Sequence, residues 1–139
     1  MRTRSPVRLV SVWCVLLLAS GAAFAAEPDW AEIADQQTVQ VITTDPDGDG
    51  RETKIWVVVL DGVGYIRTSR SSTWGDNVEL NPDIGLRVTG QDYPLRATFI
   101  EQPAERERIV TGFEAKYGAN PLLNFIRGND PRIMRLDSR

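Results

Sequence analysis

Residues 53–82 decide the fold of this chain. They read Thr53-Lys54-Ile55-Trp56-Val57-Val58-Val59-Leu60, Asp61-Gly62, Val63-Gly64-Tyr65-Ile66-Arg67-Thr68-Ser69-Arg70, Ser71-Ser72-Thr73, Trp74-Gly75-Asp76-Asn77-Val78-Glu79-Leu80-Asn81-Pro82. Residues 53–60 are apolar on both alternating faces, which predicts a strand with one face inside a barrel and the other under a helix or a partner subunit. Asp61-Gly62 predicts a tight hairpin turn, because such turns need positive φ. Residues 65–69 return as a strand, and a short helix over residues 74–80 stops at Asn81-Pro82, since proline cannot continue it.

The other parts of the chain predict a mainly β domain with flanking helices. Short strands alternate with turn residues, and the clearest helix has an apolar stripe, a proline near its start and a glycine after its end. The predicted elements are a helix over 28–36, a strand over 38–44, a turn over 45–51, strands over 84–89 and 95–101 joined through 90–94, a long helix over 105–117, a short helix over 121–127 and a strand over 133–136. About six strands, with one long helix after the fifth, predict a six-stranded split β-barrel.

The segment 53–82 combines an apolar wall with cations and hydroxyls where a strand gives way to a loop. This arrangement suits a ligand with a flat ring and an anionic tail. A phosphate is bound by cationic N–H donors, hydroxyls and backbone amides near a helix N-terminus. The segment therefore predicts a binding site rather than only a structural hairpin.

In the order and spacing of residues 30–118, the chain resembles the flavin-binding split-barrel superfamily. That superfamily includes the pyridoxamine-phosphate-oxidase-like and deazaflavin-dependent nitroreductase-like proteins, and the likeness is to its small bacterial members. The resemblance implies that the flavin phosphate is held where the third strand enters the next loop, and that an Asn-Pro ends the following helix. The cofactor-binding residues that it implies are Ile55, Trp56, Val57, Arg67, Thr68, Arg70, Ser72, Thr73, Trp74 and Asn77.

The basic residues of this segment depart from the family pattern. Many relatives have lysine or arginine at the position of Trp74, so the positive charge here would come from Arg67 or Arg70. These two point to opposite faces of a regular strand, so only one can reach a phosphate unless the strand breaks at Ser69. The alternative is that both arginines are solvated and Trp74 belongs to the core. Arg132 is expected far from the loop, so Arg67→Ala should weaken cofactor binding more than Arg132→Ala.

The N-terminus is typical of a secretory signal peptide over residues 1–25. Arg2, Arg4 and Arg8 form a basic region, residues 10–19 are mostly apolar, and Ala23-Phe24-Ala25 is a small-x-small cleavage site. The apolar run is too short for a spanning helix, and an uncleaved membrane anchor is the alternative. Cleavage leaves residues 26–139 as one domain, and we expect the mature protein to be secreted or periplasmic with no stable membrane anchor.

The composition of the mature chain excludes several chemistries. It has no histidine, and Cys14, the single cysteine, leaves with the signal. A Ser-His-Asp triad, a thiol nucleophile, a disulfide and an ordinary zinc site are therefore excluded. Cleavage removes three of the 16 basic residues and none of the 19 acidic ones, so the net charge changes from −3 to −6. Such an acidic chain is a poor nucleic-acid binder.

The stretch Asp45-Pro46-Asp47-Gly48-Asp49-Gly50 resembles the start of a calcium-binding EF-hand loop. Its twelfth position, which needs a bidentate glutamate, is Trp56 inside a predicted strand. The stretch is therefore interpreted as a polar hairpin turn, with no metal site predicted.

Two functional hypotheses follow. The first is an exported flavin-dependent oxidoreductase, because a cofactor can supply the electron chemistry that the side chains lack. FMN is compatible with this hypothesis, and a deazaflavin suits an exported protein less well. The second is a cofactor-free split-barrel module that binds a small ligand or a protein partner in the same groove. The resemblance also implies a homodimer, and no catalytic residue is predicted.

Overall fold

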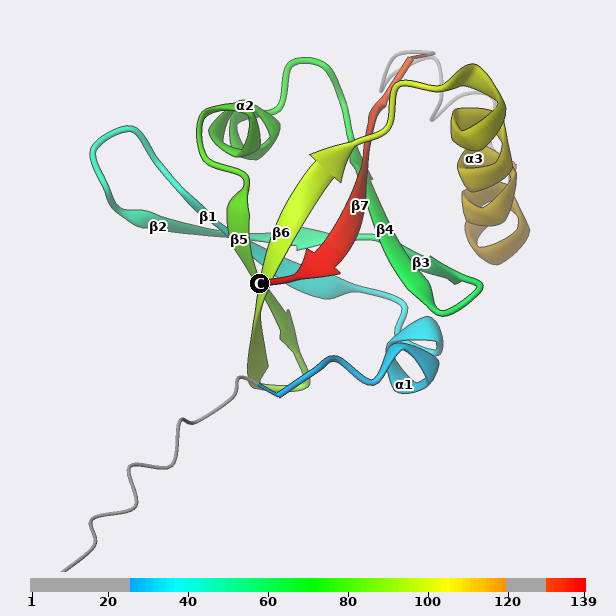
Figure 1. Ribbon diagram of the computed structural model, residues 1–139, viewed down its shortest axis with the longest axis horizontal. Coiled ribbons are helices and arrows are strands. Elements are labelled where there is room, and N and C mark those ends of the chain that lie inside the picture. Colours follow the sequence, from blue (N-terminus) through cyan, green and yellow to red (C-terminus); the bar gives the residue numbers. More distant parts are fainter. Residues whose placement is uncertain (1–25, 120–129) are drawn as a thin grey trace, which may run out of the picture.

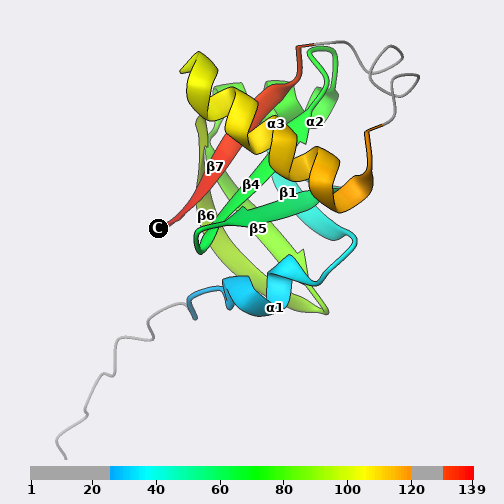
Figure 2. The same cartoon turned by 90° about the vertical axis from the view of Figure 1, so that its right-hand side faces the viewer.

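A curled antiparallel sheet forms the body of the protein in the computed structural model, which describes residues 26–119 and 130–139. Its seven strands are β1 (Val39–Thr44), β2 (Gly50–Ile55), β3 (Val57–Leu60), β4 (Val63–Thr68), β5 (Asp83–Val88), β6 (Gln91–Phe99) and β7 (Arg132–Ser138). The described helices are α1 (Trp30–Ala34), α2 (Thr73–Leu80) and α3 (Pro103–Tyr117). Figures 1 and 2 show α1 and α2 at opposite ends of the curled sheet, with α3 along its outer side.

The strand order explains the curl. The order is β2-β1-β5-β6-β7-β4-β3, so the two strands at its ends follow one another along the chain, separated by Trp56. Ile55 pairs with Val39 of β1, whereas Val57 pairs with Ile66 of β4. The predicted single strand over residues 53–60 is therefore two strands that serve opposite ends of the sheet. This break corrects the predicted six-stranded barrel to a seven-stranded curled sheet.

Contacts from α3 account for the break. The hydroxyl of Tyr117 lies 3.1 Å from the backbone N of Val57 and 2.8 Å from its carbonyl O. The ammonium of Lys116 also donates to that carbonyl at 2.9 Å and to Gln36 O at 2.6 Å. Because side chains of α3 bond the backbone of Val57, the chain can leave β1 here without losing hydrogen bonds.

Two tight turns fix neighbouring strands. Asp61 and Gly62 have φ values of 52° and 75°, which confirms the predicted hairpin turn. Thr89 and Gly90 join β5 to β6 in the same way, with φ values of 47° and 84°. The predicted longer connection over 90–94 is therefore wrong, because β6 already begins at Gln91.

Pro94 lies within β6 and does not interrupt the strand. It pairs with Gly85 of β5. The pairing of β6 with β7 includes Leu95, the next residue, but not Pro94. Such a position has a strand neighbour on one side only, which is where a sheet tolerates proline.

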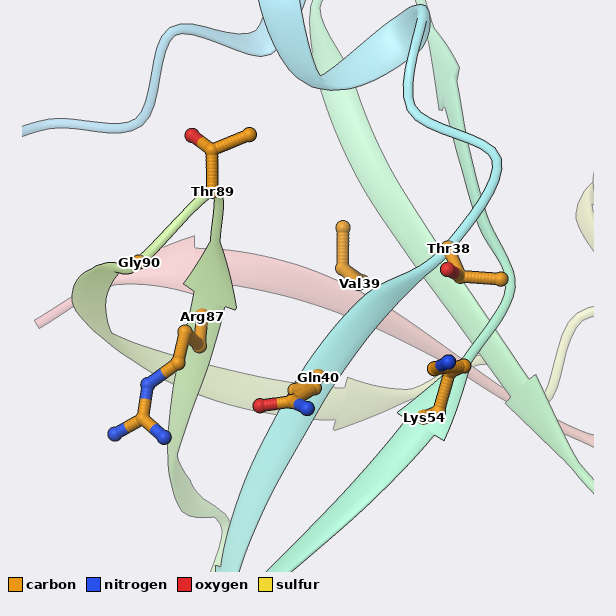
Figure 3. A pocket seen from close by; sticks show the side chains of 7 residues that line it. All are labelled: Thr38, Val39, Gln40, Lys54, Arg87, Thr89 and Gly90. Carbon is orange, nitrogen blue, oxygen red and sulfur yellow. The ribbon is translucent and has the colours of Figure 1, made fainter.

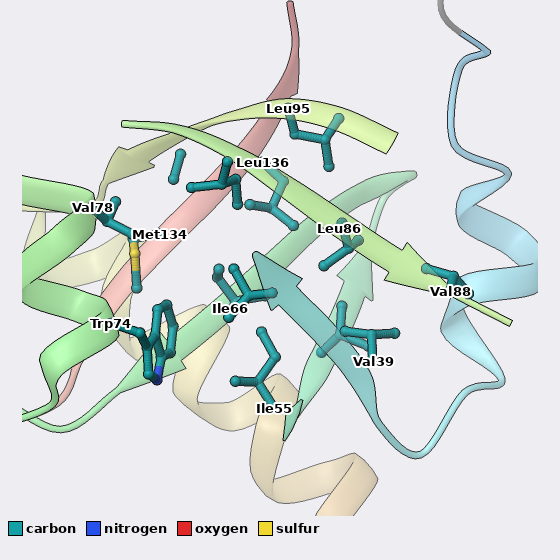
Figure 4. Close-up of a cluster of buried hydrophobic side chains, with 14 of the residues drawn as sticks. Val39, Ile55, Ile66, Trp74, Val78, Leu86, Val88, Leu95, Met134 and Leu136 are labelled. Atoms are coloured by element: carbon teal, nitrogen blue, oxygen red, sulfur yellow. The ribbon is translucent and has the colours of Figure 1, made fainter. Parts of the chain in front are cut away.

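The inside of the curled sheet holds the larger hydrophobic core. Its buried residues are Ile33, Val39, Val41, Ile55, Val57, Ile66, Trp74, Val78, Ile84, Leu86, Val88, Leu95, Ala97, Met134 and Leu136, most of which are labelled in Figure 4. Trp30 of α1 closes one end, where a Cβ on Gly64 would lie 2.2 Å from its ring. Trp74 and Val78 of α2 close the other end. The core therefore fills the space inside the curled sheet between α1 and α2.

A second core lies between the sheet and α3. It contains Val58, Tyr65, Ile100, Ile109, Phe113 and Ile133. Leu60 packs against it and lies beside Gly112, where an added Cβ would be 3.0 Å from its methyl carbons. The second apolar face of the 53–60 segment is thus covered by a helix of the same chain, one of the two outcomes that the sequence predicted.

The helices predicted over 28–36, 74–80 and 105–117 are confirmed with small differences at their ends. The predicted helix over 121–127 and the signal segment over 1–25 lie outside the described residues. Within residues 26–119 and 130–139, no helix has the length and apolar character needed to cross a membrane.

Candidate functional site

The pleat of β4 separates the predicted cofactor residues. Ile66 and Thr68 face the inside of the sheet, whereas Arg67 faces α3. The guanidinium of Arg67 lies 5.7 Å from the ring centroid of Trp56 and 5.0 Å from that of Phe113. Arg67 and Thr68 therefore lie on opposite faces, and Arg67 makes cation–π contacts within the fold.

The loop after β4 and the start of α2 form a polar edge that we call the β4–α2 rim, residues 68–74 together with Arg132. Thr68 donates a hydrogen bond from its hydroxyl to the hydroxyl of Ser72. Ser72 is the N-cap of α2 and accepts a hydrogen bond from the backbone N of Gly75 at 3.1 Å. Thr73 follows and is exposed. The predicted hydroxyls thus come together, and two of them already bond one another.

Arg132 of β7 brings a cation to the β4–α2 rim. Its guanidinium donates to Ser69 O at 3.0 Å and to Ser72 O at 3.0 Å. It also pairs with Asp76 at 2.8 Å and with Glu79 at 3.1 Å, and its side chain is only 10% exposed. The expectation that Arg132 lies far from this loop is wrong, because antiparallel pairing sets the first residue of β7 opposite Thr68, the last residue of β4.

Trp74 and Asn77 of α2 point into the protein. Trp74 belongs to the larger core, as the alternative interpretation predicted. The Asn77 amide donates to Thr43 Oγ1 at 3.2 Å and to Asp45 Oδ1 at 2.6 Å, which ties α2 to β1. Hydrogen bonds from Arg51 and Asn77 lower the pKa of Asp45 below its ordinary value. Both α2 residues are therefore used by the fold.

The predicted ring wall is also built into the protein. Ile55 and Val57 are buried in the larger core. Trp56 is half-buried and stacks on Tyr117, with ring centroids 4.3 Å apart and an interplanar angle of 3°. Burial raises the pKa of Tyr117 and lowers that of Lys116, the two residues that hold Val57. The backbone groups of Val57, expected to bond the polar edge of a ring, bond these two side chains instead.

Arg70 is part of the β4–α2 rim, but its side chain pairs with a different part of the chain. It is exposed and forms an ion pair with Asp130, which also pairs with Arg106 at 2.7 Å. The Arg70 side chain is 70% exposed, so this pair contributes little to stability. This position agrees with the interpretation of Arg70 as a solvated charge.

These contacts test whether the rim fits a flavin phosphate. The charge of Arg132 is balanced by two carboxylates, Arg70 shares the carboxylate of Asp130 with Arg106, and Arg67 lies against aromatic rings on the other face. A phosphate needs cationic donors that are not already paired with anions. The residues of the β4–α2 rim therefore do not fit a flavin phosphate in this arrangement.

The acidic stretch after β1 forms the predicted polar turn. Gly48 N donates to Asp45 O at 2.8 Å, and Asp49 N donates to the Asp47 side chain at 3.0 Å. The carboxylate of Asp45 accepts from Arg51 at 2.8 Å. In the part of the chain that the structure describes, no three acidic side chains gather closely enough to hold a metal ion.

A pocket of about 250 Å³ opens on the outer side of β1, β2 and β5 (Figure 3). We call it the Lys54 pocket. It is lined by Thr38, Val39, Gln40, Lys54, Arg87, Thr89 and Gly90. None of these residues was singled out from the sequence as a binding residue. Three of them, Gln40, Lys54 and Arg87, are polar residues within strands, which is also the pattern of any solvated strand.

No protein-family model matches the sequence, and no curated protein matches it significantly. Solved structures do match the fold. HutZ, the heme storage protein from Vibrio cholerae, has a TM-score of 0.63 and 16% identity, with 84% of this chain and 92% of that chain covered. An F420-H2 dependent reductase has a TM-score of 0.61 and 18% identity, with 73% and 95% covered. ChuZ from Campylobacter jejuni has a TM-score of 0.63 and 18% identity, with 77% and 50% covered.

The chain has the split-barrel fold. The resemblance to the pyridoxamine-phosphate-oxidase-like and deazaflavin-dependent nitroreductase-like proteins is thus confirmed at the level of the fold. The chain spans only half the length of ChuZ. Within residues 26–119 and 130–139, the β4–α2 rim and the Lys54 pocket are two polar regions that contain basic side chains.

Proposed function

We propose that this protein is a split-barrel module that binds a small ligand, and that its β4–α2 rim does not bind a flavin phosphate. One observation carries the proposal: the cations that should grip the phosphate are already paired or stacked within the fold. The guanidinium of Arg132 illustrates it, since two backbone carbonyls and two carboxylates surround it. An added dianion would compete with those carboxylates for the same donors.

The visible spectrum and a flavin titration of the mature protein test this proposal. We expect residues 26–139 to purify without visible absorbance and to leave the fluorescence of added FMN unchanged. Lumiflavin, which has the ring system but no phosphate, serves as the matched ligand control. Saturable quenching of FMN at micromolar concentration, with lumiflavin inactive, would show that a phosphate is bound and would contradict the proposal.

A flavin-dependent oxidoreductase is the second candidate. It is favoured by the fold shared with an F420-H2 dependent reductase and by the arrival of Arg132 beside Ser72 at the predicted rim. If FMN binds, Arg132→Gln should weaken it more than Arg67→Gln, because only Arg132 lies at the rim hydroxyls. This order reverses the expectation from the sequence. A flavin titration of both variants measures it, and a stronger effect of Arg67→Gln would place the phosphate on the α3 side.

Assembly and export are further parts of the proposal. The apolar face that could have required a partner is covered by α3, so the homodimer is supported by the resemblance and not by an uncovered core. Light scattering during size exclusion at micromolar concentration tests it, and a monomeric mass would contradict it. We also propose export through the signal over residues 1–25. Mass spectrometry of the secreted chain should give an N-terminus at residue 26, and an intact N-terminus would contradict cleavage.

A further inference from the structure

The Lys54 pocket is built on a row of side chains that cross three neighbouring strands. Gln40 of β1 pairs with Lys54 of β2 on one side and with Arg87 of β5 on the other. Directly paired residues point to the same face of an antiparallel sheet and lie about 5 Å apart. Figure 3 shows Gln40 between the two basic side chains. The register therefore sets an amide between two cations on the outer face of the sheet.

Lys54 differs from the other basic residues of the described ranges. Within residues 26–119 and 130–139, it is the one basic side chain without an ion pair, hydrogen bond or cation–π contact. The chain carries more acidic than basic residues, so carboxylates are available to pair with most cations. An unpaired ammonium at a concave surface is a ready partner for an external anion.

Arg87 forms one wall of the pocket but is not available as a second grip. Its guanidinium bonds both oxygens of Asp92, at 2.5 and 2.8 Å, and Glu52 at 2.5 Å. These two carboxylates raise the pKa of Arg87 and fix the orientation of its side chain. Among the described residues that line the pocket, the positive charge without a carboxylate partner is therefore that of Lys54. A single charge suits a monoanionic carboxylate better than a phosphate, whose two charges call for several cations.

Besides Val39 and Gly90, the rest of the lining is polar and has unused hydrogen-bonding groups. In the described part of the chain, the side chains of Thr38, Gln40 and Thr89 make no hydrogen bond to the protein. Hydroxyl and amide groups can both donate and accept, so they suit a ligand that carries hydroxyl or amide groups of its own. The volume of about 250 Å³ is small for a ligand site, since pockets for drug-sized ligands have volumes of roughly 300–1,000 Å³.

We propose that the Lys54 pocket binds a small polar carboxylic acid, such as a hydroxy acid, with its carboxylate on Lys54 and its polar groups on Gln40, Thr38 and Thr89. This inference rests on the proposed ligand-binding function and names the place and chemical class of the ligand. It differs from the flavin site in position, because the pocket is built from β1, β2 and β5, whereas the β4–α2 rim is built from β4, α2 and β7.

Two-dimensional amide NMR of the mature protein tests the inference. Sodium lactate is the probe, and lactamide, which has the same shape without the charge, is its control. We expect lactate to cause saturable shifts at the amides of Gln40, Lys54, Thr89 and Gly90, with a dissociation constant in the millimolar range. Lactamide should bind at least about tenfold more weakly, because it has no negative charge to pair with the ammonium of Lys54.

A matched pair of variants decides the role of Lys54. Lys54→Gln should weaken lactate binding about tenfold, whereas Arg96→Gln, which removes an exposed charge from β6, should leave it unchanged. The spectra themselves report whether each variant is folded. Equal binding of lactate and lactamide, or equal effects of the two substitutions, would overturn the inference. Because FMN is absent from this experiment, a failure here is separate from a failure of the flavin titration.

Discussion

The β4–α2 rim and the Lys54 pocket are both polar and both contain basic side chains, but they use those side chains differently. At the rim, Arg132 bonds two carbonyl oxygens and two carboxylates and is nearly buried. At the pocket, Lys54 is exposed and unpaired within the described residues. A basic residue near a predicted site is therefore not by itself a ligand-binding group. Its charge must also remain uncompensated after folding.

The largest expected difference between the two regions is in stability. Trp74→Ala should lower the free energy of unfolding by about 3–5 kcal/mol, because it empties a buried aromatic position of the larger core. Thr38→Ala, in the pocket lining, should change it by less than about 0.5 kcal/mol, since Thr38 is exposed. Urea denaturation followed by circular dichroism measures both. Equal stability of the two variants would mean that Trp74 does not belong to the core.

A smaller difference is expected when the two cations are compared directly. Arg132→Gln should lower the free energy of unfolding by about 1–3 kcal/mol, because it removes the charged hydrogen bonds to the carbonyls of Ser69 and Ser72, which then keep only backbone donors. Lys54→Gln should change it by less than about 0.5 kcal/mol. The same urea denaturation applies, and an Arg132→Gln variant as stable as Lys54→Gln would show that the rim cation is free after all.

The smallest expected effects are on two carboxyl groups, one tied to each region. Asp45 is bonded to Asn77 of α2, and Arg51 is the main cause of its lowered pKa. Asp92 stands beside the pocket, and Arg87 is the main cause of its lowered pKa. Of these two carboxyl groups, Arg51→Gln should raise the pKa of Asp45 and not that of Asp92, and Arg87→Gln should raise the pKa of Asp92 and not that of Asp45. NMR titration of the carboxyl carbons measures both values.

The direction of the pH effect follows from these lowered pKa values. Each carboxylate stabilises the fold fully above the ordinary pKa of 3.8, and the stabilisation is lost as the pH falls through the lowered folded value. Each arginine substitution should therefore lower the stability near neutral pH and make the loss of stability on acidification smaller, because the contribution that protonation removes is already gone. A substitution that shifts both carboxyl groups would show that the two regions are electrostatically coupled.

The local elements could be predicted because local chemistry fixes them. Asp61-Gly62 adopts the positive φ values that the tight turn needs, and Asn81-Pro82 follows the end of α2. The break at Trp56 could not be predicted, because it depends on Tyr117 and Lys116, about 60 residues further along the chain. The same limit applies to Arg132, which reaches the rim only through the pairing of β7 with β4.

The order of residues along the chain fixes the alternation of apolar and polar residues, the turns and the helix ends, and these features indicated a mainly β domain of the split-barrel class. These features depend on neighbours along the chain, whose spacing is set by the geometry of the backbone. Which charges are compensated depends on the three-dimensional arrangement. Ion pairs such as Arg132 with Asp76 join residues that are distant in sequence, so the register of the sheet, and not composition, leaves Lys54 without a partner among the described residues.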